Sequence, residues 1–215
     1  MSHSPGPARP PGLRTFLLLL IVLAGPRAGA QTTVGAMTFA SEGVTINTNQ
    51  PSYAYLTNGT LTLTADISSQ ATSAYLNSLV YIREFSASFT YTATTSGGFF
   101  ADGAAFVIQN SPQQASALGT AGSGLGYEGI TRSAALAFNI YGGHPIGITL
   151  AQDGYLNNYQ YTGTGNVSLV SYLPVRVDLV YSGGVLSTKL TDVTSGSIFQ
   201  TSYLIDLPSR VGGDL

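Results

Sequence analysis

Hydrophobic and polar residues alternate with a period of two along much of the chain. In 61–67, Leu61, Leu63, Ala65 and Ile67 alternate with threonine and aspartate, and 85–93 repeats the pattern with phenylalanine, tyrosine and alanine against serine and threonine. Successive side chains of a β-strand point to opposite faces, so this period predicts strands with one buried and one solvent face. Further strands are predicted at 146–150, 175–181, 185–190 and 198–205.

Short glycine-containing segments separate several of these strands. Ser182-Gly183-Gly184 lies between two predicted strands, and Asn58-Gly59 precedes another. Glycine adopts positive φ without a steric penalty, which makes such segments natural hairpin turns. Many strands at short spacing with glycine turns favour a single all-β domain, an antiparallel β-sandwich.

Two segments do not follow the alternating pattern. In 111–114, Ser111 is a capping residue and Pro112 suits a first helical position, which predicts one or two helical turns running to about Gly119. Residues 133–138 are short and apolar, and their pattern alone does not separate strand from helix. Their length favours a strand.

The first thirty residues have the pattern of a secretory signal peptide. Arg9 and Arg14 precede nine consecutive apolar residues at 16–24, and Ala28-Gly29-Ala30 follows Pro26 as a cleavage site. A spanning helix needs about 20 apolar residues, so an uncleaved anchor is the weaker interpretation. We expect a secreted, extracellular or cell-surface domain of residues 31–215, with no membrane insertion after the signal is removed.

Composition excludes several classes of function. The 215 residues carry 8 Lys plus Arg and 10 Asp plus Glu, and cleavage after Ala30 would leave five basic against ten acidic side chains. A chain this poor in basic residues cannot neutralise several phosphates, so nucleic acid is not an expected partner. The absence of cysteine excludes disulfides, thiolate metal sites and cysteine nucleophiles.

Six segments occur in the order seen in legume-type (L-type) lectins. They are FSASFTYTA (85–93), ADGAAFVIQ (101–109), GSGLGYEGI (122–130), SAALAFNIY (133–141), HPIGITL (144–150) and FQTSYLIDLP (199–208). The chain resembles a bacterial legume-lectin-like domain from about Leu61 onward. The resemblance implies a concanavalin A-like jelly-roll sandwich and non-catalytic binding of a carbohydrate or glycan.

The resemblance also implies a set of carbohydrate-binding residues. Asp102, followed by Gly103, matches the aspartate that grips the sugar, and the Ala101–Asp102 peptide bond is implied to be cis. A carboxylate accepts several hydrogen bonds and can take two adjacent hydroxyls at once. Gly122 and Ser123 match the second sugar loop, where bare backbone can approach a hydroxyl. The alternative is that Asp102 is an exposed turn residue beside Gly103.

The chain departs from this family where the lectins hold calcium and a transition metal. Ala137 and Asn139 stand at the two acidic positions, Gly143 stands at the asparagine, and His144 alone remains of the side-chain ligands. Calcium requires several carboxylate and carbonyl oxygens, so we expect no family-type metal site and no cofactor. Tyr141 keeps the aromatic position, and either stacks on a sugar or packs into the sandwich.

The C-terminal segment differs as well. After Asp206-Leu207-Pro208 the family has a further strand with its preceding sugar-specificity loop, whereas this sequence ends at Leu215. Two alternatives follow: the sequence is a fragment that is truncated at its C-terminus, or the sandwich lacks one strand.

Two other classes of function remain to be weighed. A structural or adhesive domain that has lost sugar binding is the main alternative. A sandwich glycosidase is not expected, because retaining hydrolysis usually needs two carboxyl groups about 5 Å apart. Only Glu42, Glu84 and Glu128 are glutamates, no predicted strand carries two alternating acids, and Arg176 and Asp178 are expected to pair with each other.

Overall fold

The computed structural model describes residues 22–23, 43–50, 54–57, 60–65, 68–77, 79–95 and 98–213. Within those ranges, no helix has the length and apolar character needed to cross a membrane. The predicted signal peptide and its cleavage site lie outside the described residues, apart from Val22–Leu23. Those two residues form β1, which pairs in parallel with β7.

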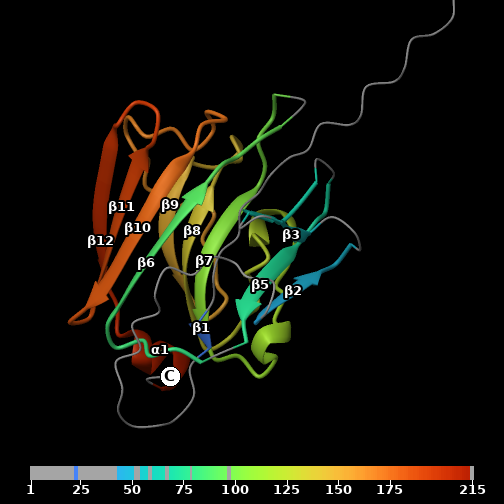
Figure 1. Ribbon diagram of the computed structural model, residues 1–215, viewed down its shortest axis with the longest axis vertical. Coiled ribbons are helices and arrows are strands. Elements are labelled where there is room, and N and C mark those ends of the chain that lie inside the picture. Colours follow the sequence, from blue (N-terminus) through green and yellow to red (C-terminus); the bar gives the residue numbers. More distant parts are fainter. Residues whose placement is uncertain are drawn as a thin grey trace, which may run out of the picture.

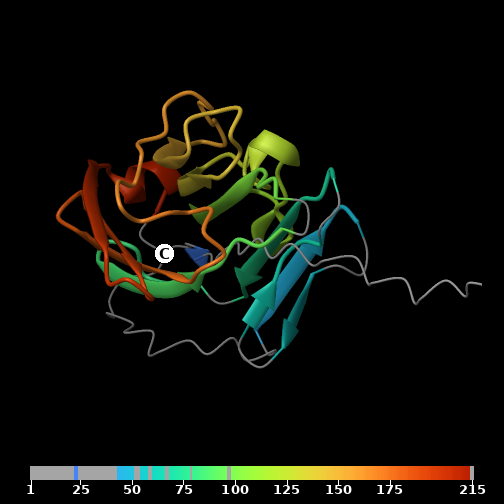
Figure 2. The same cartoon turned by 90° about the horizontal axis from the view of Figure 1, so that it is seen from above.

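Two four-stranded sheets lie face to face (Figures 1 and 2). The front sheet has the strand order β12-β11-β10-β6, and the back sheet has the order β1-β7-β8-β9. Apart from β1 and β7, all neighbours in both sheets are antiparallel. Their bounds are β6 Phe85–Tyr91, β7 Gly103–Gln109, β8 Ser133–Asn139, β9 Gly147–Gln152, β10 Val175–Ser182, β11 Val185–Asp192 and β12 Ile198–Leu204. The predicted antiparallel sandwich is confirmed.

The front sheet follows the alternating pattern closely. In β10, Val175, Val177, Leu179 and Tyr181 are buried, while the residues between them are exposed or half-buried. β6 and β11 also alternate between more and less exposed positions. Gly183 and Gly184 have φ of 58° and 77° between the paired residues Ser182 and Val185, so the predicted hairpin turn is confirmed.

The two central strands of the back sheet are buried on both faces. Every residue of β8 is buried, which confirms the strand predicted for 133–138. On the inner face, two rings of the back sheet contact Phe89 of the front sheet. The ring centroid of Phe138 in β8 lies 6.3 Å from that of Phe89, and the centroid of Phe106 in β7 lies 6.0 Å from it. On the outer face, the segment between β7 and β8 covers the sheet. Ser133 Oγ of β8 donates to the hydroxyl of the buried Tyr127 in that segment at 3.0 Å, and this bond attaches the segment to the strand.

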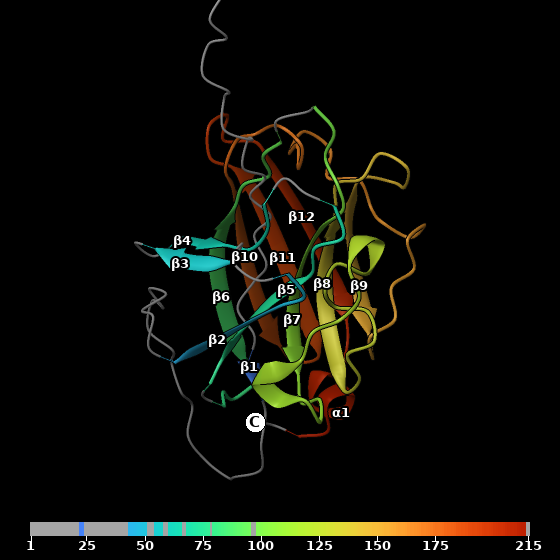
Figure 3. The same ribbon diagram turned by 90° about the vertical axis from the view of Figure 1, so that its right-hand side faces the viewer.

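Two small sheets lie beside the sandwich, and the strands of both are labelled in Figure 3. β2 (Val44–Thr48) pairs with β5 (Thr72–Leu76), and β3 (Tyr55–Thr57) pairs with β4 (Thr60–Thr62). The strand predicted from Leu61 ends early, because regular pairing stops at Thr62, although Leu63 is still buried. The last two residues of the predicted range, 66–67, lie outside the described residues. The turn predicted at 58–59 lies outside the described residues, between two strands that do pair.

Three short helices complete the described chain. η1 (Gln114–Ser116) and η2 (Gly122–Gly124) are 3₁₀ turns, and α1 (Leu207–Val211) is a single α-helical turn. The brief helix predicted after Ser111 exists but starts later than expected. Ser111 Oγ accepts from the backbone N of Gln113 at 3.3 Å, which caps a turn before the helix rather than the helix itself. Where the resemblance implied a further strand after Pro208, the structure has α1.

Candidate functional site

Asp102 lies at the start of β7, at the end of the sandwich where Gly103, Asn139 and Gly147 are register partners. We call this the Asp102 end; it is at the top of Figure 1, opposite α1. The Ala101–Asp102 peptide bond is cis, as the resemblance implies. The backbone carbonyl of Asp102 accepts from Ile140 N at 3.0 Å, which attaches this residue to the end of β8.

The Asp102 side chain is half-buried and available to a ligand. No described residue donates a hydrogen bond to its carboxylate. Burial raises the pKa of this carboxyl above its ordinary value, and the charge of nearby His144 lowers it in part. The arrangement is a partly desolvated carboxylate with unused acceptor positions, which is what recognition of neutral hydroxyl donors requires.

Two predicted glycines lie next to Asp102, and the structure excludes a Cβ at Gly103 but leaves room for one at Gly122. A Cβ on Gly122 would stand 3.7 Å from Asp102 Oδ2, so bare backbone of η2 faces the carboxylate. Gly103 has φ of 148°, and a Cβ there would overlap the carbonyl oxygen of Phe138 in the neighbouring strand. Ser123 follows Gly122 in η2 and is half-buried, but no hydrogen bond joins it to Asp102 in the described chain.

Asn139 closes the loop that connects β8 to β9. Its Nδ2 donates to the carbonyl oxygens of Tyr141 at 3.1 Å and Pro145 at 3.0 Å, and its Oδ1 accepts from Tyr141 N at 3.3 Å. The side chain is almost fully buried, with an exposed fraction of 3%. The Asn139 amide therefore helps to hold residues 140–146, together with the backbone bond from His144 N to the Tyr141 carbonyl at 3.1 Å, and the sequence did not reveal this role.

This loop carries two of the residues weighed in the sequence. The Tyr141 ring lies over Gly143, where any Cβ would overlap it, and Tyr141 is 43% exposed. It does not pack into the sandwich, so that alternative was wrong. His144 is half-buried, and its ring meets Tyr141 edge to face with centroids 5.6 Å apart. His144 Nδ1 is buried without a hydrogen-bond partner in the described chain.

Two tyrosines after β9 also belong to this end of the molecule. The Tyr159 ring meets His144 edge to face at 5.1 Å. Tyr161 is buried, its hydroxyl lacks a partner in the described chain, and burial raises its pKa to about 12, with the Asp102 charge adding to the effect. Sequence reasoning missed both residues. The bridge that fixes them, between Ile148 and Thr162, lies in a segment with no repeating pattern.

The legume-lectin fold implies a calcium and a transition metal beside the sugar, and the residues of this chain do not fit them. Asn139, which stands at the second acidic position, uses both ends of its amide on its own loop. Across the described ranges, no three side chains of histidine, cysteine, aspartate or glutamate are grouped so that they could hold a metal ion. His144 by itself is too few ligands for zinc or calcium.

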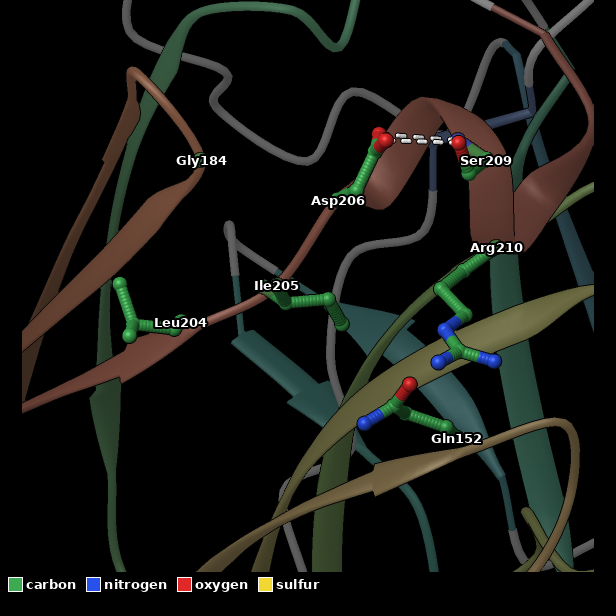
Figure 4. A pocket seen from close by; sticks show the side chains of 7 residues that line it. All are labelled: Gln152, Gly184, Leu204, Ile205, Asp206, Ser209 and Arg210. Carbon is green, nitrogen blue, oxygen red and sulfur yellow. Dashed lines mark hydrogen bonds between the residues drawn. The ribbon is translucent and has the colours of Figure 1, made fainter.

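A separate cavity of about 510 Å³ lies at the opposite end of the sandwich, beside α1 (Figure 4). Three of its polar side chains, Asp206, Ser209 and Arg210, have partners within the protein. Asp206 caps α1 by accepting from Ser209 N at 3.1 Å and from Ser209 Oγ at 2.6 Å, and these hydrogen bonds lower the pKa of its carboxyl. Arg210 lies 3.8 Å from Asp153. This cavity therefore reflects helix capping and surface ion pairing.

Asp178 of the front sheet is likewise paired. Arg176 Nε and Asp178 Oδ1 are 2.9 Å apart on the outer face of β10, as expected from the sequence. Asp178 also accepts from Ser88 Oγ of β6.

Solved structures with the same fold are plant lectins and a lectin-like protein. Arcelin-5, a lectin-like defense protein from Phaseolus vulgaris, superposes with a TM-score of 0.61 at 17% identity, covering 81% of each chain. Lectin II from Ulex europaeus gives a TM-score of 0.59 at 15% identity, covering 79% of this chain and 80% of that one. Winged bean acidic lectin, complexed with methyl-α-D-galactose, gives 0.52 at 17% identity, with 80% and 79% covered.

The same comparisons define what is shared. No protein-family profile and no curated protein sequence matches the chain. The similarity therefore lies in the three-dimensional arrangement of the strands, and the predicted legume-lectin-like β-sandwich is confirmed.

Proposed function

We propose that this chain is an exported, non-catalytic carbohydrate-binding domain that binds a glycan through Asp102 without a metal ion. The observation that carries the proposal is the Asp102 carboxylate itself. It is half-buried, faces the bare backbone of Gly122, and receives no hydrogen bond from any described residue. An ionised carboxylate that is partly desolvated forms strong hydrogen bonds with neutral donors, and a pair of adjacent sugar hydroxyls supplies two of them.

The groups around Asp102 add further polar contacts. His144 Nδ1 and the Tyr161 hydroxyl are both buried without partners in the described chain. Both side chains lie close enough to Asp102 for their electrostatics to be coupled, since the charge of His144 lowers the pKa of the Asp102 carboxyl and the charge of Asp102 raises that of Tyr161. The surroundings of the carboxylate are therefore polar as well as partly buried.

The two finer parts of the proposal rest on different features. Export rests on the leader-like pattern of the first thirty residues. Metal independence rests on the amide of Asn139, whose hydrogen bonds hold the loop at the position where an ion-binding acid would stand. The non-catalytic assignment rests on Asp102 being a single carboxylate, since glycoside hydrolysis usually uses a pair.

The test is binding of the full chain to an array of neutral glycans, including galactosides, in the presence and absence of a chelator. We expect binding that the chelator does not reduce. Asp102→Ala should weaken it by about 1.5–3 kcal/mol, the contribution of a charge-assisted hydrogen bond. Asp178→Ala is the matched control, because it removes an aspartate from the outer face of β10 and should leave binding unchanged.

Two results would contradict the proposal. Binding that disappears with the chelator would show that an ion is needed. No binding to any glycan would support the alternative of a structural or adhesive sandwich.

A further inference from the structure

Three rings form a continuous row beside Asp102, and we call it the aromatic row: Tyr141, His144 and Tyr159. His144 is the middle ring, and its centroid lies 5.6 Å from that of Tyr141 and 5.1 Å from that of Tyr159. Both contacts are edge to face, with interplanar angles of 74° and 87°. The row joins the loop between β8 and β9 to the segment between β9 and β10.

The outer ring of the row is unusually exposed. Tyr159 is 75% exposed, so most of its ring is in contact with solvent. Its backbone is nevertheless fixed, because Tyr159 N donates to Asn157 Oδ1 at 3.1 Å. A rigidly placed and exposed tyrosine ring presents an apolar surface at small entropic cost, which is a common property of binding sites.

The row is continuous with the site around Asp102. At one end, Tyr141 follows Ile140, whose N–H donates to the Asp102 carbonyl. At the other end, the Tyr159 ring contacts His144, whose charge acts on the Asp102 carboxyl. A ligand held by Asp102 would therefore extend along the row when it is longer than one sugar unit.

The charges around the site define the class of ligand. Three arginines of the described chain have partners of their own. Arg176 pairs with Asp178, and Arg210 lies near Asp153. Arg132 donates to the Val211 carbonyl near α1. Lys189 lies in β11 opposite Asp178, and the charge of Arg83 acts on Asp206 at the α1 end. An acidic sugar at the row would meet the negative charge of Asp102, which repels it, and the charge of His144, which opposes that repulsion in part.

We propose that the aromatic row is a second subsite beside Asp102, and that the ligand is an uncharged oligosaccharide of at least two sugar units. This inference rests on the proposed function. The first unit is held by Asp102 through its hydroxyls. The next unit lies with its apolar ring face on Tyr159, so affinity increases with chain length.

The experiment measures dissociation constants of the full chain for neutral galacto-oligosaccharides and cello-oligosaccharides of one to four units, with sialylated and sulfated lactose for comparison. We expect the affinity to rise between one and three units. Tyr159→Ala should remove that rise, a loss of about three- to tenfold for the trimer, while leaving the monosaccharide value unchanged. The acidic sugars should bind more weakly than neutral lactose.

Tyr155→Ala is the matched control, because Tyr155 is a similarly exposed tyrosine (68% against 75% for Tyr159) in the same connecting segment but outside the row. It should leave both affinities unchanged. Equal affinities for one and three units, an unchanged length dependence in Tyr159→Ala, or tighter binding of acidic sugars would each overturn the inference while leaving Asp102 as the binding residue. Failure of the wild-type chain to bind any sugar would overturn the proposed function as well.

Discussion

Asn139 and Tyr141 are hydrogen-bonded to each other in both directions. Asn139 Nδ2 donates to the Tyr141 carbonyl at 3.1 Å, and Tyr141 N donates to Asn139 Oδ1 at 3.3 Å. The second amide hydrogen reaches the carbonyl of Pro145. One buried side chain thus fixes both ends of the loop that presents Tyr141 and His144.

The first prediction follows from the two donors of this amide. Asn139→Asp keeps the shape and the bond from Tyr141 N, but it places a carboxylate oxygen against two carbonyl oxygens. We expect a loss of about 1–3 kcal/mol in the free energy of unfolding, measured by denaturant titration, together with weaker sugar binding.

Asn47→Ala is the control for this variant. Asn47 also uses its Nδ2 on a backbone carbonyl, that of Ala115, but it belongs to the small β2–β5 sheet. It should lower stability and leave sugar affinity unchanged. Wild-type affinity in a folded Asn139→Asp protein would show that sugar binding does not depend on the hydrogen bonds donated by the Asn139 amide.

The second prediction concerns the pH dependence of Asp102. Because burial raises the pKa of its carboxyl, the folded chain holds the Asp102 proton to a higher pH than the unfolded chain does. The resulting contribution to stability is complete below the unfolded pKa and is lost as the pH rises through the folded pKa. Sugar binding requires the opposite form, so affinity should fall as the pH is lowered through that same raised value.

The test compares wild type with Asp102→Asn. At neutral pH we expect the variant to melt at a higher temperature than wild type and to bind sugar less tightly. Below the unfolded pKa, where Asp102 is protonated in both states, the difference in stability should disappear. A variant that is less stable than wild type at neutral pH would contradict the assignment of burial as the main cause of the shift.

The third prediction uses two adjacent glycines. A Cβ on Gly143 would overlap the Tyr141 ring, whereas a Cβ on Gly142 meets nothing within 4 Å. Gly143→Ala should therefore displace Tyr141 and weaken sugar binding by about three- to tenfold, the size of one aromatic contact. Gly142→Ala should bind normally in the same calorimetric titration. Equal affinities in the two variants would place Tyr141 outside the binding surface.

The sandwich was largely predictable because its front sheet is half-buried. β10 and β11 alternate between core and solvent positions, and Gly183 and Gly184 mark the turn between them. β8 has no such alternation, since segments on both sides bury it, and only its length indicated a strand. The early end of β4 had no signal, because Leu63 stays buried after regular pairing stops.

The candidate site was predictable only in part. Asp102, Gly103 and Gly122 are found together, at positions that the sequence resemblance indicated. Tyr159 reaches His144 through the chain path after β9, which no local pattern encodes. Asn139 was recognisable as a replacement for an acid, but its hydrogen bonds depend on the exact course of the following loop.

The last prediction separates the scaffold from the site by means of two buried hydroxyls. Tyr181 Oη donates to the Ile205 carbonyl and accepts from Leu207 N, both at 3.1 Å, so it attaches the start of α1 to the front sheet. Tyr91 Oη is buried with no partner in the described chain. Tyr181→Phe should therefore cost about 1–3 kcal/mol, because it leaves two buried backbone groups unsatisfied. Tyr91→Phe should be neutral or stabilising, because it removes a hydroxyl that is desolvated without compensation.

Denaturant titration measures both changes, and sugar affinity should be unaltered in either variant. Equal destabilisation by the two substitutions would show that the Tyr181 hydrogen bonds do not contribute to the free energy of unfolding.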